Sequence, residues 1–331
     1  MRPQEKQRTM EAFVVDHATP AHLRAGRVAR PEPGKSEALV SVEAFSLNRG
    51  ECHLLHYFPD GHIPGWDLAG VVVAAAQDGS GPAVGTRVFG FVESGSWAEL
   101  ARVPTGHLAA LPAGLDLGVA ASLPIVGLSA WHALDRAGLE PGMRVLVTGP
   151  SGGFGQLAIQ LARLRGGEVE ALVARPGHER LLKQLGVRAI HERELPPGRQ
   201  FDLILESVGG ETLGAAIRAV RPGGTVVTLG NTSDEPTTFD SRDLFSEAPG
   251  ARLLGFLLFA DLEPGGESDN LAQLARHVLD GALTVQVSAE YSWPALPDAI
   301  DALMSRQVVG KAVIRLARDR GTGLVGAVAG G

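Results

Sequence analysis

Residues 144–163 limit the possible folds of this 331-residue chain more than any other segment. Val145, Leu146 and Val147 form the short apolar run of a buried strand, and leucines recur at helical spacing after residue 156. Several glycines stand between the two runs. The pattern predicts a strand, a glycine-rich turn and a helix in one unbroken unit.

The glycines of this turn have separate physical tasks. Gly149 permits a tight turn, Gly152 lets the backbone approach a pyrophosphate, and Gly155 lets the helix pack closely on the strand. The N-terminus of the helix then offers free N–H groups and a positive dipole end to phosphates. Such a turn is a weak signal alone, but between a strand and a helix it predicts a dinucleotide site. The expected contacts are Gly149, Ser151, Gly152, Gly153, Phe154 and Gly155.

The next predicted strand, residues 169–173, indicates which dinucleotide is bound. A fold that reads the ribose of NAD usually carries an acidic residue near the end of this strand, whereas this chain has Arg175. A guanidinium binds a 2′-phosphate through charge-assisted hydrogen bonds. We therefore expect NADP(H) as the cofactor; the alternative is that Arg175 is a solvated surface residue.

Further alternating elements follow, with strands expected at 201–205 and 225–229 and a helix at 211–219. Alternation of this kind predicts an α/β fold with a doubly wound parallel sheet, whose ligands lie at the carboxyl ends of the strands. Gly230 and Asn231 stand at one such end and are expected to contact the cofactor.

The first part of the chain has a different pattern, with short alternating runs at 38–43, 68–73, 84–90 and 96–100 that predict a β-rich domain. A helical stretch is expected from residue 112 toward residue 134, and a strand at 308–314 closes the chain. We place a domain boundary near residue 120 and expect the last segment to rejoin the first domain. Residues 1–10 and 318–331 are expected to be loosely held ends.

Composition excludes several classes of protein. A formal charge of −7 without a basic run argues against a nucleic-acid partner. The N-terminus lacks the apolar core of a signal peptide, and no long apolar run predicts a membrane span. Cys52 is the only cysteine, which rules out an internal disulfide and suits the cytoplasm. We expect a cytoplasmic protein with no membrane association.

Several ordered motifs together resemble the medium-chain dehydrogenase/reductase superfamily, and within it the zinc-free quinone oxidoreductase and enoyl reductase branch. Besides the glycine turn they are residues 46–51, 64–72, 84–88, 123–130, 206–213 and 310–314. The resemblance implies a GroES-like β-rich catalytic domain made of residues 1–120 and 261–331, with flexible ends. It also implies that a Rossmann NADP-binding domain, residues 121–260, is inserted between them, with a cleft between the domains.

The resemblance also implies that no metal is bound. Zinc-dependent members have Gly-His-Glu where this chain has Gly65-Trp66-Asp67, so a histidine ligand is missing. Cys52, His53 and His56 form a local cluster, but three ligands on one short segment seldom complete a tetrahedral site. Without zinc, a conjugated acceptor is the favoured substrate, because its developing negative charge spreads onto an oxygen that hydrogen-bond donors stabilise.

Three residues of the early loop are the catalytic candidates. Asn48 matches a family asparagine near the nicotinamide and could orient the ring or the substrate carbonyl, or merely cap the loop. His53 stands where many relatives carry a tyrosine, and it could donate a proton or only pack. Tyr57 lies near, but out of register with, the tyrosine that some enoyl reductases use as an acid.

Three further residues resemble family positions beside the cofactor, although each could simply belong to the core: Ser129, Phe256 and Leu257. The apolar run at 253–259 is interpreted either as an edge strand that pairs two subunits, as in related dimers, or as a buried strand. A homodimer is the expected assembly.

The sequence thus predicts a zinc-independent, NADPH-dependent reductase that transfers hydride to a conjugated enone, an enoyl group or a quinone. Two alternatives remain open. One is a specialised enoyl reductase that tailors a single biosynthetic intermediate, and the other is a non-catalytic NADPH-binding sensor, since a fold does not by itself guarantee chemistry.

Overall fold

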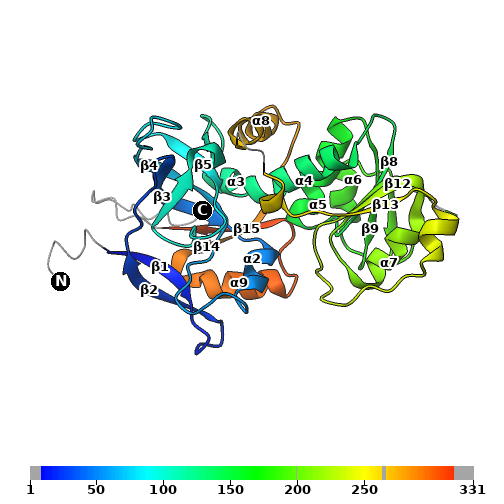
Figure 1. Cartoon of the computed structure of the whole chain (residues 1–331), viewed down its shortest axis with the longest axis horizontal. Helices are drawn as coiled ribbons and strands as arrows, with labels where there is room; N and C mark the ends of the chain where they lie inside the picture. Colours follow the sequence, from blue (N-terminus) through cyan, green and yellow to red (C-terminus); the bar gives the residue numbers. More distant parts are fainter. Residues whose placement is uncertain (1–8, 199, 263–265, 317–331) are drawn as a thin grey trace, which may run out of the picture.

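The computed structural model describes residues 9–198, 200–262 and 266–316, which form two lobes joined by helices (Figure 1). One lobe is β-rich and contains both the early strands and the last ones. The other lobe holds a six-stranded parallel sheet. The expected loose ends, residues 1–10 and 318–331, lie outside the described residues except for residues 9 and 10, which begin the first strand.

The β-rich lobe contains a hairpin and a seven-stranded sheet of order β14-β15-β3-β4-β5-β7, in which β6 also pairs with β3. Its strands are β1 (Thr9–Val15), β2 (Leu23–Ala29), β3 (Glu37–Ser46), β4 (Asp67–Ala74), β5 (Arg87–Phe91), β6 (Leu100–Pro104), β7 (Leu108–Ala110), β14 (Val287–Ser292) and β15 (Lys311–Arg315). Its helices are α2 (Arg49–Leu54), η1 (Thr105–His107), α3 (Leu117–Ala121), η4 (Trp293–Ala295) and α9 (Leu296–Met304).

The end of the chain returns to the first lobe through hydrogen-bonded strands. β15 pairs antiparallel with β3, and β14 pairs parallel with β15. These pairings join strands that are far apart in the sequence. The exact boundaries at residues 120 and 260 remain predictions.

The second lobe has the strand order β10-β9-β8-β11-β12-β13, and every neighbouring pair is parallel. Its strands are β8 (Arg144–Thr148), β9 (Glu168–Val173), β10 (Ala189–Glu192), β11 (Phe201–Glu206), β12 (Val220–Thr228) and β13 (Arg252–Gly255). Its helical segments are α5 (Gly153–Leu164), α6 (Glu179–Gln184), α7 (Gly210–Ala219), η2 (Asp243–Glu247) and η3 (Leu258–Ala260). The α/β fold predicted from the sequence is confirmed.

The side chains of these buried strands point alternately to the two faces of the parallel sheet, which explains why helices cover both faces. Val145 and Val147 of β8 belong to the core shared with α5, whereas Leu146 between them packs in a separate cluster with Ala216 of α7. Successive side chains of a strand point to opposite faces, so a continuous apolar run requires cover on both sides.

Two helices lie at the junction of the lobes, α4 (Pro124–Ala137) and α8 (Ser268–Leu279). The core around α4 is continuous across the junction, because it includes Phe89 and Phe91 of β5 as well as Leu157 of α5.

The helical stretch expected from residue 112 proves to be two helices, α3 and α4. Asp116 begins α3, since its carboxylate accepts hydrogen bonds from two backbone N–H groups.

Candidate active site between the lobes

The glycine-rich turn that follows β8 has the geometry of a phosphate-binding helix start. Gly149 has a left-handed φ of +57°, and a Cβ on Gly155 would lie 2.7 Å from the Cα of Pro150, so neither position suits a larger residue. Gly152 caps α5, and a Cβ there would meet only the Gly149 carbonyl oxygen, at 3.5 Å. The first N–H groups of a helix have no intrahelical partner. The turn therefore fits a pyrophosphate.

The loop after β11 is held beside this turn by a buried carboxylate. Glu206 accepts hydrogen bonds from the Val208 N–H at 2.7 Å, from the Gly209 N–H at 3.1 Å and from the Thr148 hydroxyl at 3.0 Å. Burial raises the pKa of Glu206, while these donors act in the opposite direction. The sequence analysis placed Glu206 in a family motif but did not predict that its carboxylate holds this loop. The pattern that could have indicated this role is an acidic residue between a buried strand and two glycines.

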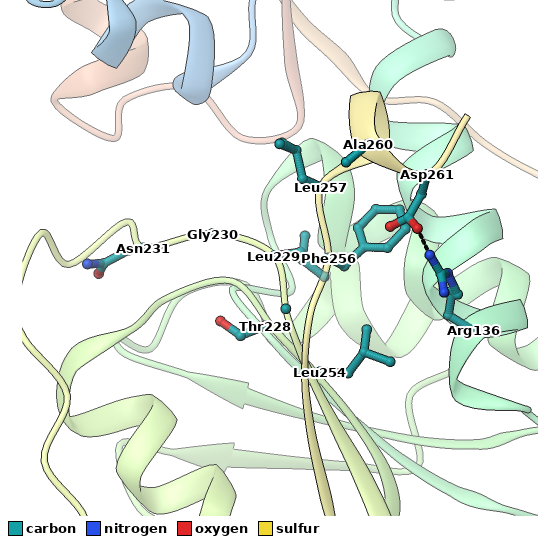
Figure 2. Close-up of a pocket in the computed structure, with 11 residues that line it drawn as sticks. Arg136, Thr228, Leu229, Gly230, Asn231, Leu254, Phe256, Leu257, Ala260 and Asp261 are labelled. Atoms are coloured by element: carbon teal, nitrogen blue, oxygen red, sulfur yellow. Dashed lines mark ion pairs between the residues drawn. The ribbon is translucent and has the colours of Figure 1, made fainter. Parts of the chain in front are cut away.

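A pocket of about 680 Å³ opens at the carboxyl ends of β12 and β13 (Figure 2). Asn231, on the loop after β12, lies across this pocket from Phe256 and Leu257, on the loop after β13. The Phe256 side chain is buried, whereas Leu257 is 61% exposed. The lining residues are Arg136, Thr228, Leu229, Gly230, Asn231, Leu254, Gly255, Phe256, Leu257, Ala260 and Asp261. Four predicted cofactor contacts, Gly230, Asn231, Phe256 and Leu257, are thus brought together.

One wall of the pocket is fixed by an ion pair. Arg136 of α4 pairs with Asp261, which follows η3, and Figure 2 shows this contact beside Phe256. Four residues earlier on the same helix, His132 contacts the buried Glu267 at 2.9 Å. Residues four apart lie on one helix face. The segment that follows β13 is therefore tied to α4 at two points.

Asn48, the predicted catalytic asparagine, belongs to a buried polar network. Its side-chain N–H groups donate to Asp67 at 2.8 Å and to Glu51 at 3.3 Å, and its oxygen accepts from the Lys311 ammonium at 2.6 Å. Ser46 also donates to Asp67, at 2.7 Å. The amide of Asn48 is thus fully engaged by protein groups, and Lys311, Glu51 and Asp67 are site residues that sequence reasoning missed.

The network contains two carboxylates and one ammonium group, so its charge depends on protonation. Burial, followed by the neighbouring charge of Asp67, raises the pKa of Glu51 to about 8. Burial also raises the pKa of the Cys52 thiol well above its ordinary value. Cys52 lies in the hydrophobic core beside the network, where an apolar environment disfavours the thiolate.

Lys311 connects this network to the glycine turn. A Cβ on Gly153, the first residue of α5, would lie 2.6 Å from the Lys311 side-chain Cδ, so the lysine stem packs on the start of that helix. The neighbouring Gly310 donates its N–H to the Ser151 carbonyl oxygen at 3.0 Å. Lys311 therefore contacts both the predicted cofactor turn, at Gly153, and the predicted catalytic residue Asn48.

The other predicted residues are less engaged with protein groups. Tyr57 is 71% exposed, and its ring lies 5.4 Å from that of the half-buried His53. Arg175 is exposed beyond the end of β9. Ser129 is half-buried on α4 and does not line the pocket. Their assignments to the site stay predictions.

The Cys/His cluster of the early loop does not converge. Cys52 is buried in the core, whereas the ring of His56 is exposed and packs against the His22 ring, with centroids 4.7 Å apart. Among the residues that the structure describes, no group of three or more histidine, cysteine or acidic side chains could hold a metal ion.

No helix within the described ranges is long and apolar enough to cross a membrane.

Comparison with known proteins identifies the family. Residues 34–113 match the family model described as “Alcohol dehydrogenase GroES-like domain”, and residues 184–314 match the model described as “Zinc-binding dehydrogenase”. The spectinabilin polyketide synthase system protein NorB of Streptomyces orinoci is 32% identical over 84% of this chain and 13% of its own length. The chain spans 16% of the length of the mycocerosic acid synthase-like polyketide synthase of Mycobacterium tuberculosis and 7% of that of the mycoketide-CoA synthase of the same organism.

Solved structures show the same fold over almost the whole chain. A mycobacterial protein, Rv1454c, in complex with NADPH superposes with a TM-score of 0.84 at 25% identity, covering 92% of this chain and 99% of that chain. The quinone oxidoreductase from Coxiella burnetii gives 0.79 at 24% identity, with 93% and 100% covered. The CurK enoyl reductase gives 0.78 at 21% identity, with 94% and 100% covered.

The fold and the two matched family models define an oxidoreductase with a nucleotide-binding domain for a nicotinamide cofactor. The chain belongs to the medium-chain dehydrogenase/reductase superfamily.

Proposed function

We propose that the protein is a zinc-independent, NADPH-dependent reductase that transfers hydride to a conjugated enone, an enoyl group or a quinone. The observation that carries this proposal is the pocket of about 680 Å³ at the carboxyl ends of β12 and β13. Ligands of open parallel sheets bind outside the carboxyl ends of the strands. The glycine turn lies at the carboxyl end of β8 in the same sheet.

NADP(H) fits the residues that are present, and when bound it would supply the hydride. The start of α5 would bind the pyrophosphate, because Gly152 leaves that side open and the helix has N–H groups to donate. Gly230, Asn231, Phe256 and Leu257 would surround the nicotinamide end in the pocket. Ser129, half-buried on α4, is proposed as a cofactor contact only from its resemblance to a family position. Arg175 is exposed beyond β9 and is available for a 2′-phosphate, which favours NADPH over NADH.

The chain's own polar groups have separate roles in this proposal. Asn48 positions the early loop rather than donating freely, since its amide is bound by Lys311, Asp67 and Glu51. His53 and Tyr57 are not enclosed in this way, and they are the groups that could deliver a proton to the substrate. Hydrogen-bond donors of this kind stabilise an oxyanion without a metal ion.

We also propose a homodimer formed through β13, which is one of the two edge strands of the parallel sheet. Leu253 on this strand is 43% exposed, and an exposed edge presents unpaired backbone groups to another chain. A sedimentation mass equal to one chain would contradict this assembly.

The likeness to polyketide synthases favours an enoyl group within the proposed substrate class, which makes a specialised tailoring reductase the second candidate. The test is to titrate NADPH and NADH against the metal-free protein and to follow reduced-nicotinamide absorbance with enones, quinones and saturated ketones. Oxidation of NADPH by conjugated acceptors alone is the expected result. Tight NADPH binding without turnover on any acceptor would instead support the sensor, and failure to bind either nucleotide would overturn the proposal.

A further inference from the structure

Trp66 stands on a rigid stretch of backbone between the two lobes. Gly65 before it has a left-handed φ of +103° and is too closely packed against Trp97 and Ser96 for any side chain. The Trp66 N–H donates to the buried Glu51 at 2.6 Å, and its carbonyl oxygen accepts from the Val92 N–H at 2.9 Å. The indole ring therefore projects from a fixed position.

The ring is held between the early loop and the segment that lines the pocket. A Cβ on Gly50 of α2 would lie 2.7 Å from the Cη2 atom of the indole, so only glycine allows this approach. On the other lobe, the Phe259 ring lies 5.3 Å away at 70°, an edge-to-face contact. Phe259 immediately precedes Ala260 and Asp261, which line the pocket. The indole thus connects the catalytic loop with the pocket wall.

Part of this indole is open to a ligand. Trp66 is only half-buried, whereas Trp97 is completely buried. The indole N–H of Trp66 makes no hydrogen bond with any residue that the structure describes, and it is not among the buried unpartnered atoms, as the Trp97 N–H is. A rigid aromatic side chain with an open polar edge is suited to contact a ligand that is flat and carries an oxygen.

We propose that Trp66 contacts the substrate and selects extended planar acceptors over small ones. The proposal rests on the reductase function proposed above and specifies the substrate class of the same site. A fused-ring quinone or a long conjugated acyl group would pack against the indole, whereas a small enone would be too short to gain from this surface.

The first test compares menadione, a fused-ring planar quinone, with methyl vinyl ketone, a small enone. The measured quantity is the ratio of kcat/KM for the two acceptors in Trp66→Leu and Trp66→Phe. An aromatic contact contributes about two- to twelvefold, so Trp66→Leu should lower the menadione ratio by that factor while Trp66→Phe retains most of it. Trp131→Phe is the matched control, because Trp131, on α4, packs against Arg165 at the end of α5, whereas Trp66 contacts Phe259 beside the pocket. An unchanged ratio in Trp66→Leu would overturn the proposal.

The second test does not depend on turnover. Menadione is titrated into the complex with oxidised NADP⁺, which has no hydride to transfer, while tryptophan fluorescence is recorded with correction for absorbance. The chain has four tryptophans, and direct contact with Trp66 predicts that Trp66→Phe loses much of the saturable quenching while Trp131→Phe keeps it. Equal quenching in Trp66→Phe and wild type would refute the contact. If wild type reduces neither acceptor, the proposed function fails, and quenching still decides the role of Trp66.

Discussion

Replacing the buried Glu51 by Gln is expected to remove a large part of the pH dependence of the stability of the β-rich lobe. The Glu51 side chain is fully buried, and burial raises its pKa from an ordinary 4.5 to about 8. Between these two values the folded protein keeps a proton that the unfolded chain releases. Because the folded state then binds more protons, the free energy of unfolding falls as the pH rises.

The structure sets the size and the window of this effect. The contribution of Glu51 is fully present below the unfolded pKa of 4.5 and is lost as the pH rises through the folded pKa of about 8. The steepest slope is about 1.4 kcal/mol per pH unit, which gives a ceiling of about 5 kcal/mol over the whole window. The pKa of about 8 already includes the opposing effect of the hydrogen bonds that the backbone N–H groups of Asn48 and Trp66 donate to Glu51.

Urea unfolding followed by tryptophan fluorescence measures this prediction, because Trp66, Trp97 and Trp293 lie in the β-rich lobe. Free energies of unfolding are compared for wild type and Glu51→Gln from about pH 5 to about pH 9. The variant is expected to be less stable at low pH, because the NH₂ group of Gln would face a backbone N–H that donates to Glu51 in the wild type. Its free energy of unfolding should nevertheless change less with pH. Parallel curves would show that Glu51 does not hold a proton near neutral pH.

Three further substitutions test the site. Gly155→Ala should abolish NADPH binding measurable by calorimetry, because the new methyl group would meet the Gly149 carbonyl oxygen and lie 2.7 Å from the Pro150 Cα. Unchanged affinity would contradict the assignment of this turn to the cofactor. Arg175→Glu should weaken NADPH at least about tenfold more than NADH in fluorescence titrations, since it replaces a phosphate-binding guanidinium by a repelling carboxylate, and equal losses would remove Arg175 from the site. Asn48→Ala should lower kcat at least about tenfold with little change in NADPH affinity, because it leaves Asp67 as the remaining partner of the buried Lys311 ammonium and so disturbs the early loop. Steady-state kinetics with unaltered kcat would exclude Asn48 from the active site.

The parts of the fold that could be predicted are those specified by neighbouring residues. The strand, turn and helix of residues 144–164 follow from an apolar run, three glycines and helical spacing, all within one short window. The helical stretch beyond residue 112 was less well predicted, because its division into α3 and α4 depends on a single capping aspartate and a short break. The apolar run near residue 253 could not be assigned from periodicity, since edge and buried strands look alike there; its pairing with β12 alone makes β13 an edge.

The candidate site divides in the same way. Gly230 and Asn231 could be placed at the cofactor site from their position after a predicted parallel strand, and they line the pocket. The roles of Lys311 and Asp67 could not be predicted, because the two residues are 244 positions apart and meet only when β15 returns to β3.

The sequence by itself determined the alternation of strands and helices, the glycine turn and the absence of a histidine at position 66, because each depends only on residue types and local spacing. Only the tertiary structure decided that Asn48 is enclosed by Lys311, Glu51 and Asp67, and that Trp66 meets Phe259 across the lobes. Those contacts join residues far apart in the chain, and their energies depend on burial and distance, which local spacing does not specify.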